Sequence, residues 1–135
     1  MKGYVTDIEE ATLKNSLYRQ VLFTAKNSQL VLMSLKPGEE IGEEVHELDQ
    51  FLRFEAGDGT VILDGQDHAV RDGFVVVIPS GTRHNVINTS ESADLKLYSL
   101  YSPPEHKVGT VHRTKQEADA DADHHFDGRT SIDSK

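Results

Sequence analysis

The chain has 135 residues, which suffice for one domain with a substantial core and are too few for two. The chain has 14 Lys and Arg residues and 23 Asp and Glu residues, and its formal net charge of −9 disfavours nucleic acid and anionic membranes as partners. No apolar run approaches the roughly 20 residues that span a bilayer. The absence of Cys excludes disulfides, thiolate metal sites and Cys nucleophiles, so a metal would have to be held by nitrogen and oxygen.

The chain opens on MKGYVTDIEE, with acidic residues where a signal peptide has an apolar core, so a cytoplasmic protein is expected. A short helical turn is predicted over residues 7–15, with Asp7 as its cap. Further along, short runs rich in Val, Ile, Leu and Phe have the length of strands and lack the 3.6-residue period of helices. These runs are residues 20–24, 29–35, 50–55, 60–63, 74–78, 85–88 and 95–101.

Turn signals separate these runs. Asp64 and Gly65, between TVIL and QDHAV, indicate a two-residue hairpin, because a type I′ turn needs positive φ at both central positions. Many short strands broken by Gly or Pro turns predict an all-β fold, a single barrel or sandwich. The runs LVLMSL and FVVVI are apolar on both faces, which predicts a homodimer that covers their outer side unless a flanking segment does so.

The composition changes once, near Pro103 and Pro104. Residues 1–104 are predicted to form the barrel domain, and residues 105–135 a polar C-terminal tail. Thr114 and Glu117 have the spacing of a capping box, but no apolar stripe follows. The tail, which holds four histidines, is therefore predicted to be a short marginal helix or a solvated segment.

Two segments gather polar residues beside strand and turn signals. In the first, Glu44 and His46 are separated by one residue, so both would face the same side of an extended strand, and Gln50 opens the next apolar run. In the second, a turn at residues 79–81 precedes His84, which opens the strand that follows. Because polar side chains are costly to bury among short apolar strands, this pattern favours a divalent metal that offsets their desolvation.

The spacing of these segments resembles the paired motifs of the cupin superfamily. The first family motif, G-x5-H-x-H-x3,4-E-x6-G, is matched by Gly38, Glu44, His46, Gln50 and Gly57, with Glu in place of the first His and Gln in place of the Glu. The second, G-x5-P-x-G-x2-H-x3-N, is matched without departure, and 15 residues separate the two motifs. Its residues here are Gly73, Pro79, Gly81, His84 and Asn88.

The resemblance implies a small antiparallel cupin (jelly-roll) barrel that holds a metal through Glu44, His46, Gln50 and His84. Two imidazoles and one carboxylate are the donors of the facial triad of non-haem Fe(II) sites, and the same set suits Mn, Co, Ni or Zn. One carboxylate leaves a bound dication with about one net positive charge, which favours an anionic oxygen donor from a small-molecule substrate. In the competing interpretation, the two histidines are rim residues of a barrel without metal, and Glu44 is a carboxylate that orients a histidine.

Three functions remain open at this point. Small cupins of this kind resemble the mannose-6-phosphate isomerase type, which implies isomerisation of a sugar or carbonyl compound. The donor set instead favours dioxygenation of an enolisable carbonyl compound at Fe(II), and a non-catalytic metal- or sugar-binding cupin is the alternative outside enzymes. Glu40, which shares strand parity with Glu44, is the one candidate for a catalytic acid or base, whereas Asn88 is expected to support the fold.

Overall fold

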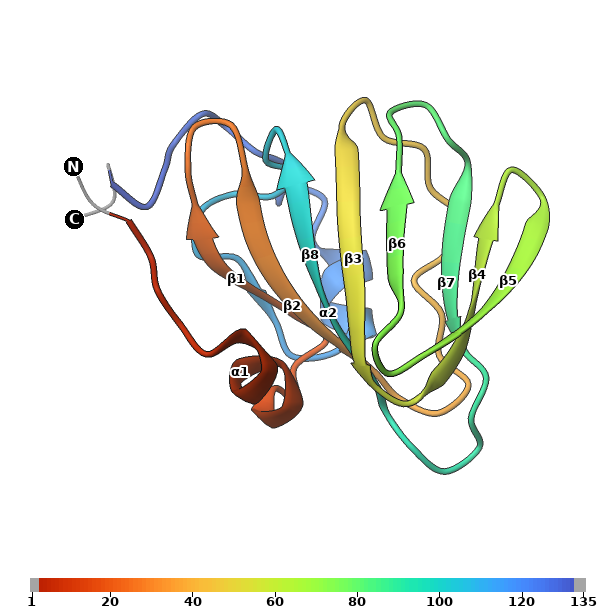
Figure 1. Ribbon diagram of the computed structural model, residues 1–135. Helices are drawn as coiled ribbons and strands as arrows, with labels where there is room; N and C mark the ends of the chain where they lie inside the picture. Colours follow the sequence, from red (N-terminus) through yellow and green to blue (C-terminus); the bar gives the residue numbers. More distant parts are fainter. Residues whose placement is uncertain (1–2, 133–135) are drawn as a thin grey trace.

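The computed structural model describes residues 3–132, which form antiparallel strands and two short helices (Figure 1). The predicted strands are all present, with boundaries shifted by at most two residues. The elements are α1 (Ile8–Lys14), β1 (Arg19–Thr24), β2 (Gln29–Leu35), β3 (Asp49–Ala56), β4 (Asp58–Leu63), β5 (Gln66–Arg71), β6 (Val75–Ile78), β7 (His84–Asn88), β8 (Leu95–Ser102), β9 (Val111–His112) and α2 (Lys115–Ala120).

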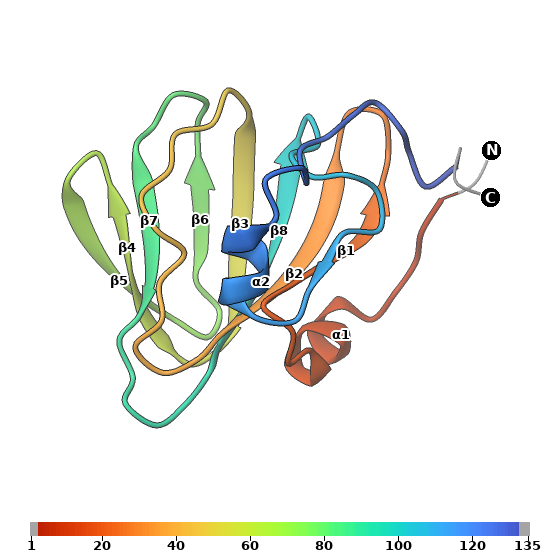
Figure 2. The same cartoon turned by 180° about the vertical axis from the view of Figure 1, so that it is seen from behind.

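The strands form two facing sheets. One has six strands in the order β6-β3-β8-β2-β1-β9, and the other has three in the order β5-β4-β7 (Figures 1 and 2). All of the pairings between named strands are antiparallel. The chain passes from one sheet to the other in the connections β3–β4, β5–β6, β6–β7 and β7–β8. The prediction of an all-β, single-domain jelly roll is confirmed.

Local signals in the sequence act as predicted at two turns. The Asp7 side chain accepts a hydrogen bond from the Glu10 amide at 3.1 Å and so caps α1. Asp64 and Gly65 have φ of 46° and 82°, the positive values that a type I′ turn requires, and they join β4 to β5. The QDHAV segment after this turn is therefore a strand of its own, the outer strand of the small sheet.

A glycine of the first motif allows two segments to pack closely. Gly57, between β3 and β4, has φ of +98°, and a Cβ on it would lie 2.5 Å from the Asp94 carbonyl oxygen. No side chain fits there without a shift of the backbone. This close approach sets the corner at which the chain passes from the large sheet to the small one.

The inner face of the large sheet buries polar side chains among apolar ones. The register places Leu52 of β3 opposite Ser99 of β8, and Ser99 opposite Val31 of β2, all fully buried. One step along, Gln50 lies opposite Tyr101, and both are buried. Polar side chains are therefore carried into the interior by the alternation of these strands.

The segment after Pro104 packs on the barrel, so the prediction of a solvated tail is wrong for it. Strand β9 pairs with β1, and His106 and His112 are 2% and 3% exposed. The short helix is present as α2: Thr114 caps it by accepting a hydrogen bond from the Glu117 amide, and Ala118 belongs to the buried apolar cluster (Figure 2). Helix α2 is therefore stabilised by the burial of Ala118 against the core, although it has no apolar stripe. The domain boundary at residue 104 stays a prediction.

The outer face of the large sheet is partly covered. Helix α1 contacts β2, β3 and β8, so a flanking segment covers one part of this face. Val75, Val77 and Leu100 remain exposed on β6 and β8. The homodimer that was expected to cover such residues stays a prediction. Within residues 3–132, neither helix has the length and apolar character needed to cross a membrane.

Candidate metal centre

Backbone pairing brings the two sequence motifs together. Glu44 and His46 lie in the segment between β2 and β3, outside any named strand, rather than on the extended strand that was expected. Glu44 forms an isolated bridge with His84, the first residue of β7, in which each amide donates to the other residue's carbonyl at 2.8 and 2.9 Å. The side chains of the two motifs are thus held on neighbouring backbones.

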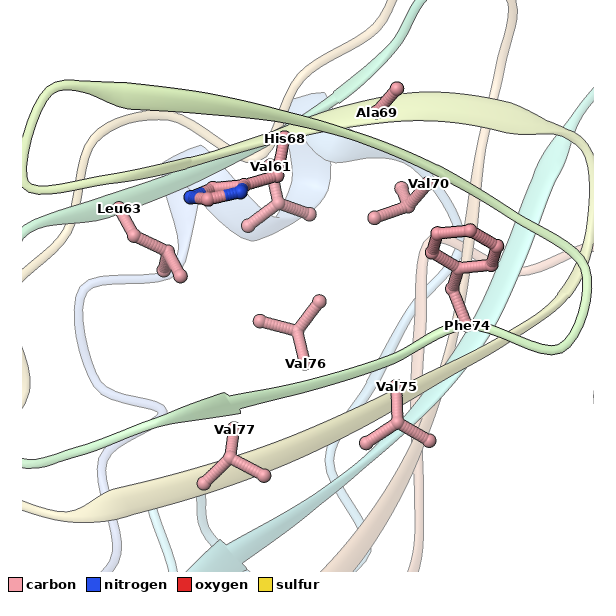
Figure 3. Close-up of a pocket in the computed structure, with 9 residues that line it drawn as sticks. All are labelled: Val61, Leu63, His68, Ala69, Val70, Phe74, Val75, Val76 and Val77. Carbon is pink, nitrogen blue, oxygen red and sulfur yellow. The ribbon is translucent and has the colours of Figure 1, made fainter.

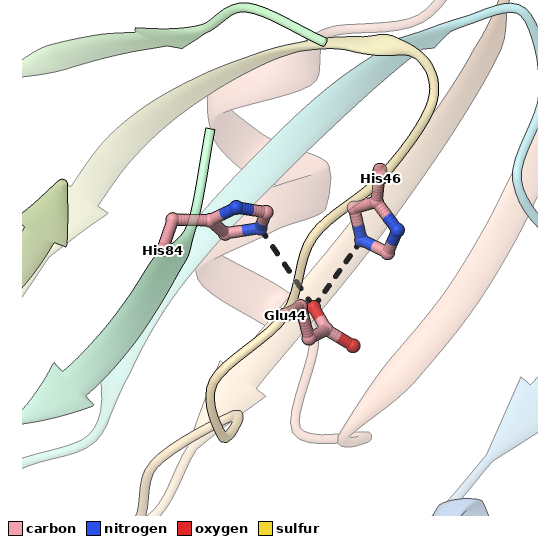
Figure 4. A group of neighbouring side chains, drawn as sticks. All are labelled: Glu44, His46 and His84. Carbon is pink, nitrogen blue, oxygen red and sulfur yellow. Dashed lines mark ion pairs between the residues drawn. The ribbon is translucent and has the colours of Figure 1, made fainter. Parts of the chain in front are cut away.

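Three side chains converge at this bridge. Each of Glu44, His46 and His84 offers one ligand atom, and these atoms all lie within 4.8 Å of one another. The Glu44 carboxylate stands between the two imidazoles, with Oε1 3.3 Å from His46 Nε2 and 3.9 Å from His84 Nε2 (Figure 4). The spacing is that of donor atoms that surround a common point.

The hydrogen bonds of His84 fix its tautomer. Its Nδ1 lies 2.9 Å from the Thr82 carbonyl oxygen, which can only accept, so Nδ1 carries the proton. The lone pair of Nε2 is then free, and this buried atom has no hydrogen-bond partner. The Thr82 carbonyl thus fixes the orientation of the imidazole, an arrangement that is usual for metal-binding histidines.

Gln50 has a similar unpaired acceptor. Its side chain is buried, and Nε2 donates to Ser99 Oγ at 3.2 Å. This contact orients the amide and leaves Oε1 buried without a partner. Unpaired buried acceptors are rare, because each costs about 1–3 kcal/mol, so Gln50 Oε1 and His84 Nε2 both call for a donor or a cation.

Sequence reasoning missed Glu105, which comes from the segment after β8. Its Oε1 lies 3.7 Å from His46 Nδ1, and its Oε2 lies 3.8 Å from His125 Nε2. Burial, reinforced by the charge of Glu44, raises the pKa of Glu105 despite these two histidines. Nothing local in the sequence signals the contact, because 59 positions separate residues 46 and 105. Glu105 also lines a hollow of about 610 Å³ beside His46.

The electrostatics of the group favour positive charge between its members. Burial by itself would raise the pKa of Glu44, but the hydrogen bond and charge of His46, with Arg19 and His84, outweigh it and lower the pKa. Burial would likewise lower the pKa of His46, but the hydrogen bond and charge of Glu44, with the charge of Glu105, raise it. A proton on His46 and a bound cation would compete for the same place.

Two further residues singled out from the sequence lie outside this group. Glu40 is exposed and accepts a hydrogen bond from Asn85 Nδ2 at 3.0 Å, so the structure does not bring this catalytic candidate to Glu44. Asn88 donates to the carbonyl oxygens of Leu35 and Ala93 at 3.0 and 2.9 Å, which confirms that it supports the fold.

A second hollow, between the edge strands β5 and β6, lacks such chemistry (Figure 3). It has a volume of about 310 Å³ and is lined mainly by apolar side chains. His68 is the one ionisable residue among those that line it, and it cannot form a metal site alone. Among residues 3–132, the group of His and carboxylate side chains with the spacing of metal ligands is Glu44, His46 and His84.

Comparisons with known proteins agree with this architecture. Residues 31–101 match the Cupin domain family. The chain is 48% identical over 129 residues to the uncharacterized protein YrkC of Bacillus subtilis (strain 168), which covers 90% of this chain and 69% of YrkC. It is 45% identical over 113 residues to the uncharacterized protein L612 of Acanthamoeba polyphaga mimivirus, covering 80% of this chain and 70% of L612. The crystal structure of BH2720 from Bacillus halodurans is similar over 89% of this chain and 96% of that one, with 43% identity and a TM-score of 0.86.

Proposed function

The chain belongs to the cupin family, and from that premise we propose that Glu44, His46, Gln50 and His84 hold one divalent transition metal, and that the protein is a metal-dependent enzyme acting on a small oxygen-rich molecule. The observation that carries the proposal is that Glu44, His46 and His84 offer ligand atoms within 4.8 Å of one another, with the buried lone pair of His84 Nε2 unpaired. A cation bound by Glu44 and His46 would satisfy His84 Nε2 and offset its desolvation, and ligation by Gln50, which the motif spacing suggests, would satisfy the unpaired Oε1.

The donors decide which ions fit. Two imidazole nitrogens, one carboxylate and one amide oxygen suit Fe, Mn, Co, Ni or Zn, and the absence of thiolate disfavours softer ions. A bound cation would supply Lewis-acid polarisation of a substrate oxygen or, as Fe(II), redox chemistry with dioxygen. The single carboxylate leaves about one net positive charge, so an anionic oxygen of the substrate is the favoured further ligand.

The chain's own residues orient these donors. The Thr82 carbonyl holds His84 with Nε2 free, and Ser99 orients the Gln50 amide. Glu105 lies 3.7 Å from His46 Nδ1, and its negative charge favours a proton on that nitrogen, which leaves Nε2 to act as a ligand. The Glu44 side chain is 37% exposed, so solvent and a small substrate reach the group from its side.

Two reactions fit the centre. Its two imidazoles and one carboxylate favour oxygenation of an enolisable carbonyl compound, because this is the donor composition of the Fe(II) facial triad. Isomerisation of a sugar or carbonyl compound requires in addition a group that moves a proton. Glu40, the candidate from the sequence, is exposed and bonded to Asn85, which favours oxygenation between the two.

Elemental analysis of protein purified without an affinity tag tests the metal. We expect about one transition-metal ion per chain in the wild type and its loss in His84→Ala and His46→Ala, because each removes a donor. His68→Ala, which removes an exposed imidazole on β5, is the matched control and should keep the ion. Full retention of the ion by both site variants would contradict the assignment.

Dioxygen uptake then separates the functions. In an oxygen electrode, the iron-loaded protein should consume dioxygen with small 1,3-diketones, and His84→Ala should not. Turnover of sugars without dioxygen uptake would identify an isomerase. A stoichiometric ion without turnover of either class would favour the non-catalytic metal-binding alternative.

A further inference from the structure

Tyr101 lies on the inner face of β8, next to one of the proposed metal ligands. The register places it opposite Gln50 of β3 on one side and opposite Gln29 of β2 on the other, and all three are buried. Residues directly opposite each other on antiparallel strands have Cβ atoms about 5 Å apart and project from the same face of the sheet. The side chain of Tyr101 therefore stands beside that of Gln50 in the interior of the barrel.

The ring of Tyr101 also contacts a second proposed ligand. Its centroid lies 6.2 Å from that of the His46 ring and 5.4 Å from that of the His106 ring, and the planes of both pairs meet at 86°. Edge-to-face contacts of this kind are a preferred arrangement of aromatic rings. The sheet and these two imidazoles together fix Tyr101 beside the candidate metal centre.

The hydroxyl of Tyr101 has no partner within the part of the chain that the structure describes. The residue is 3% exposed, and no group in residues 3–132 forms a hydrogen bond with this hydroxyl. The oxygen is not one of the side-chain polar atoms that are buried without a partner in that range, so the small part of Tyr101 that a water-sized molecule reaches includes the hydroxyl. Because buried tyrosine hydroxyls usually find a partner, this one is a donor left open to a small molecule.

The polar neighbours of Tyr101 on the inner face are bonded elsewhere. Gln29 donates to the His106 carbonyl at 2.7 Å, and Gln50 donates to Ser99 Oγ at 3.2 Å. The hydroxyl between them thus serves neither glutamine. A phenylalanine would fill the same place in the core without a polar group to desolvate, so packing alone does not explain the tyrosine.

We propose that Tyr101 binds the substrate by donating its hydroxyl to an oxygen of the molecule that the metal holds. The inference rests on the proposed function, because the metal fixes the first oxygen of that molecule. A phenol is protonated at neutral pH and donates well to a carbonyl or negatively charged oxygen. The class of substrate that fits is a small molecule with two neighbouring oxygen atoms, one for the metal and one for Tyr101.

Binding of acetohydroxamate to the cobalt-loaded protein tests this proposal. The probe offers two neighbouring oxygen atoms, and the visible absorption of Co²⁺ reports its arrival at the metal. Tyr101→Phe removes the hydroxyl alone. We expect its affinity for acetohydroxamate to fall roughly 10- to 100-fold, as for the loss of a hydrogen bond to a charged group. Its affinity for cobalt should stay, since the hydroxyl is not a proposed ligand.

Tyr98→Phe is the matched control. Tyr98 lies on the same strand with the opposite parity, opposite Arg53, so its hydroxyl belongs to the other face of the sheet and both affinities should stay. The melting temperature of metal-free Tyr101→Phe should not fall, because the hydroxyl has no partner to lose. An unchanged affinity for acetohydroxamate in Tyr101→Phe, an equal loss in the control, or a lower melting temperature would overturn the proposal.

Fluorine NMR of protein labelled with 3-fluorotyrosine gives a second measurement that does not depend on Tyr101→Phe. The chain has four tyrosines, so the signal of Tyr101 is the one that persists in Tyr4→Phe, Tyr18→Phe and Tyr98→Phe. Acetohydroxamate should shift this signal saturably in zinc-loaded protein and not in metal-free protein. A Tyr101 signal that does not respond while the probe binds would overturn the role of Tyr101.

The two proposals fail in distinguishable ways. Cobalt that does not bind overturns the metal centre, and this inference with it. Cobalt that binds, with acetohydroxamate bound equally by the wild type and Tyr101→Phe, overturns the role of Tyr101 alone. Cobalt that binds in a protein that acetohydroxamate does not affect also overturns this inference, because the metal then has no open position beside Tyr101, whereas metal binding stands.

Discussion

Replacing Glu105 with Gln tests whether a residue from the C-terminal segment supports the proposed centre. Glu105 lies 3.7 Å from His46 Nδ1, and its side chain is 14% exposed. Gln has the same shape and can still accept a hydrogen bond, so the substitution removes the charge with little change in packing. Outer carboxylates of this kind contribute roughly 10- to 100-fold to metal affinity.

The geometry sets the expected loss near the lower end of that range. At 3.7 Å the contact is longer than a hydrogen bond, so Glu105 acts on His46 through its charge, which weakens with distance. We therefore expect Glu105→Gln to weaken the affinity for zinc about 10-fold, which corresponds to about 1.4 kcal/mol. The melting temperature of the metal-free protein should not fall, since the variant no longer buries a carboxylate.

Competition with a chromophoric chelator measures the zinc affinity, and thermal unfolding monitored by circular dichroism measures the stability. Glu47→Gln is the matched control, because Glu47 lines the same hollow but is exposed and should leave the affinity unchanged. An unchanged affinity in Glu105→Gln would refute the orienting role. A lower melting temperature of the metal-free variant would show that Glu105 stabilises the fold instead.

Two more substitutions test the C-terminal segment and the outer face. Gln29 donates to the His106 carbonyl at 2.7 Å and accepts from the amides of Glu105 and His106 at 3.2 and 3.0 Å. Gln29→Ala should therefore lower the free energy of unfolding, measured in urea, by about 3 kcal/mol. An unchanged unfolding midpoint would show that these hydrogen bonds do not hold the C-terminal segment on the barrel. The predicted homodimer should become a monomer in Val77→Lys, because Val77 is 60% exposed on β6; light scattering should then give half the wild-type mass, and a monomeric wild type would end the prediction.

The sequence by itself determined the fold and the pairing of the motifs. Alternating apolar runs and turn residues place most strands, and the positive φ of Asp64 and Gly65 follows from their residue types. The spacing around His46 and His84 indicates the three side chains that the structure brings within 4.8 Å. Such features are local, because strand parity and turn geometry depend on a few neighbouring residues.

Only the tertiary structure decided what surrounds that group. Glu105 reaches His46 from the segment that follows β8, and Arg19 acquires its buried position when β1 pairs with β2 and β9. Because residues 19 and 21 have the same strand parity, the sequence could have placed Arg19 on the inner face with Val21. No local feature of the sequence shows that Arg19 lacks a carboxylate partner within residues 3–132. Burial and the pairing of charges depend on contacts between residues far apart in the chain, and a spacing pattern does not contain them.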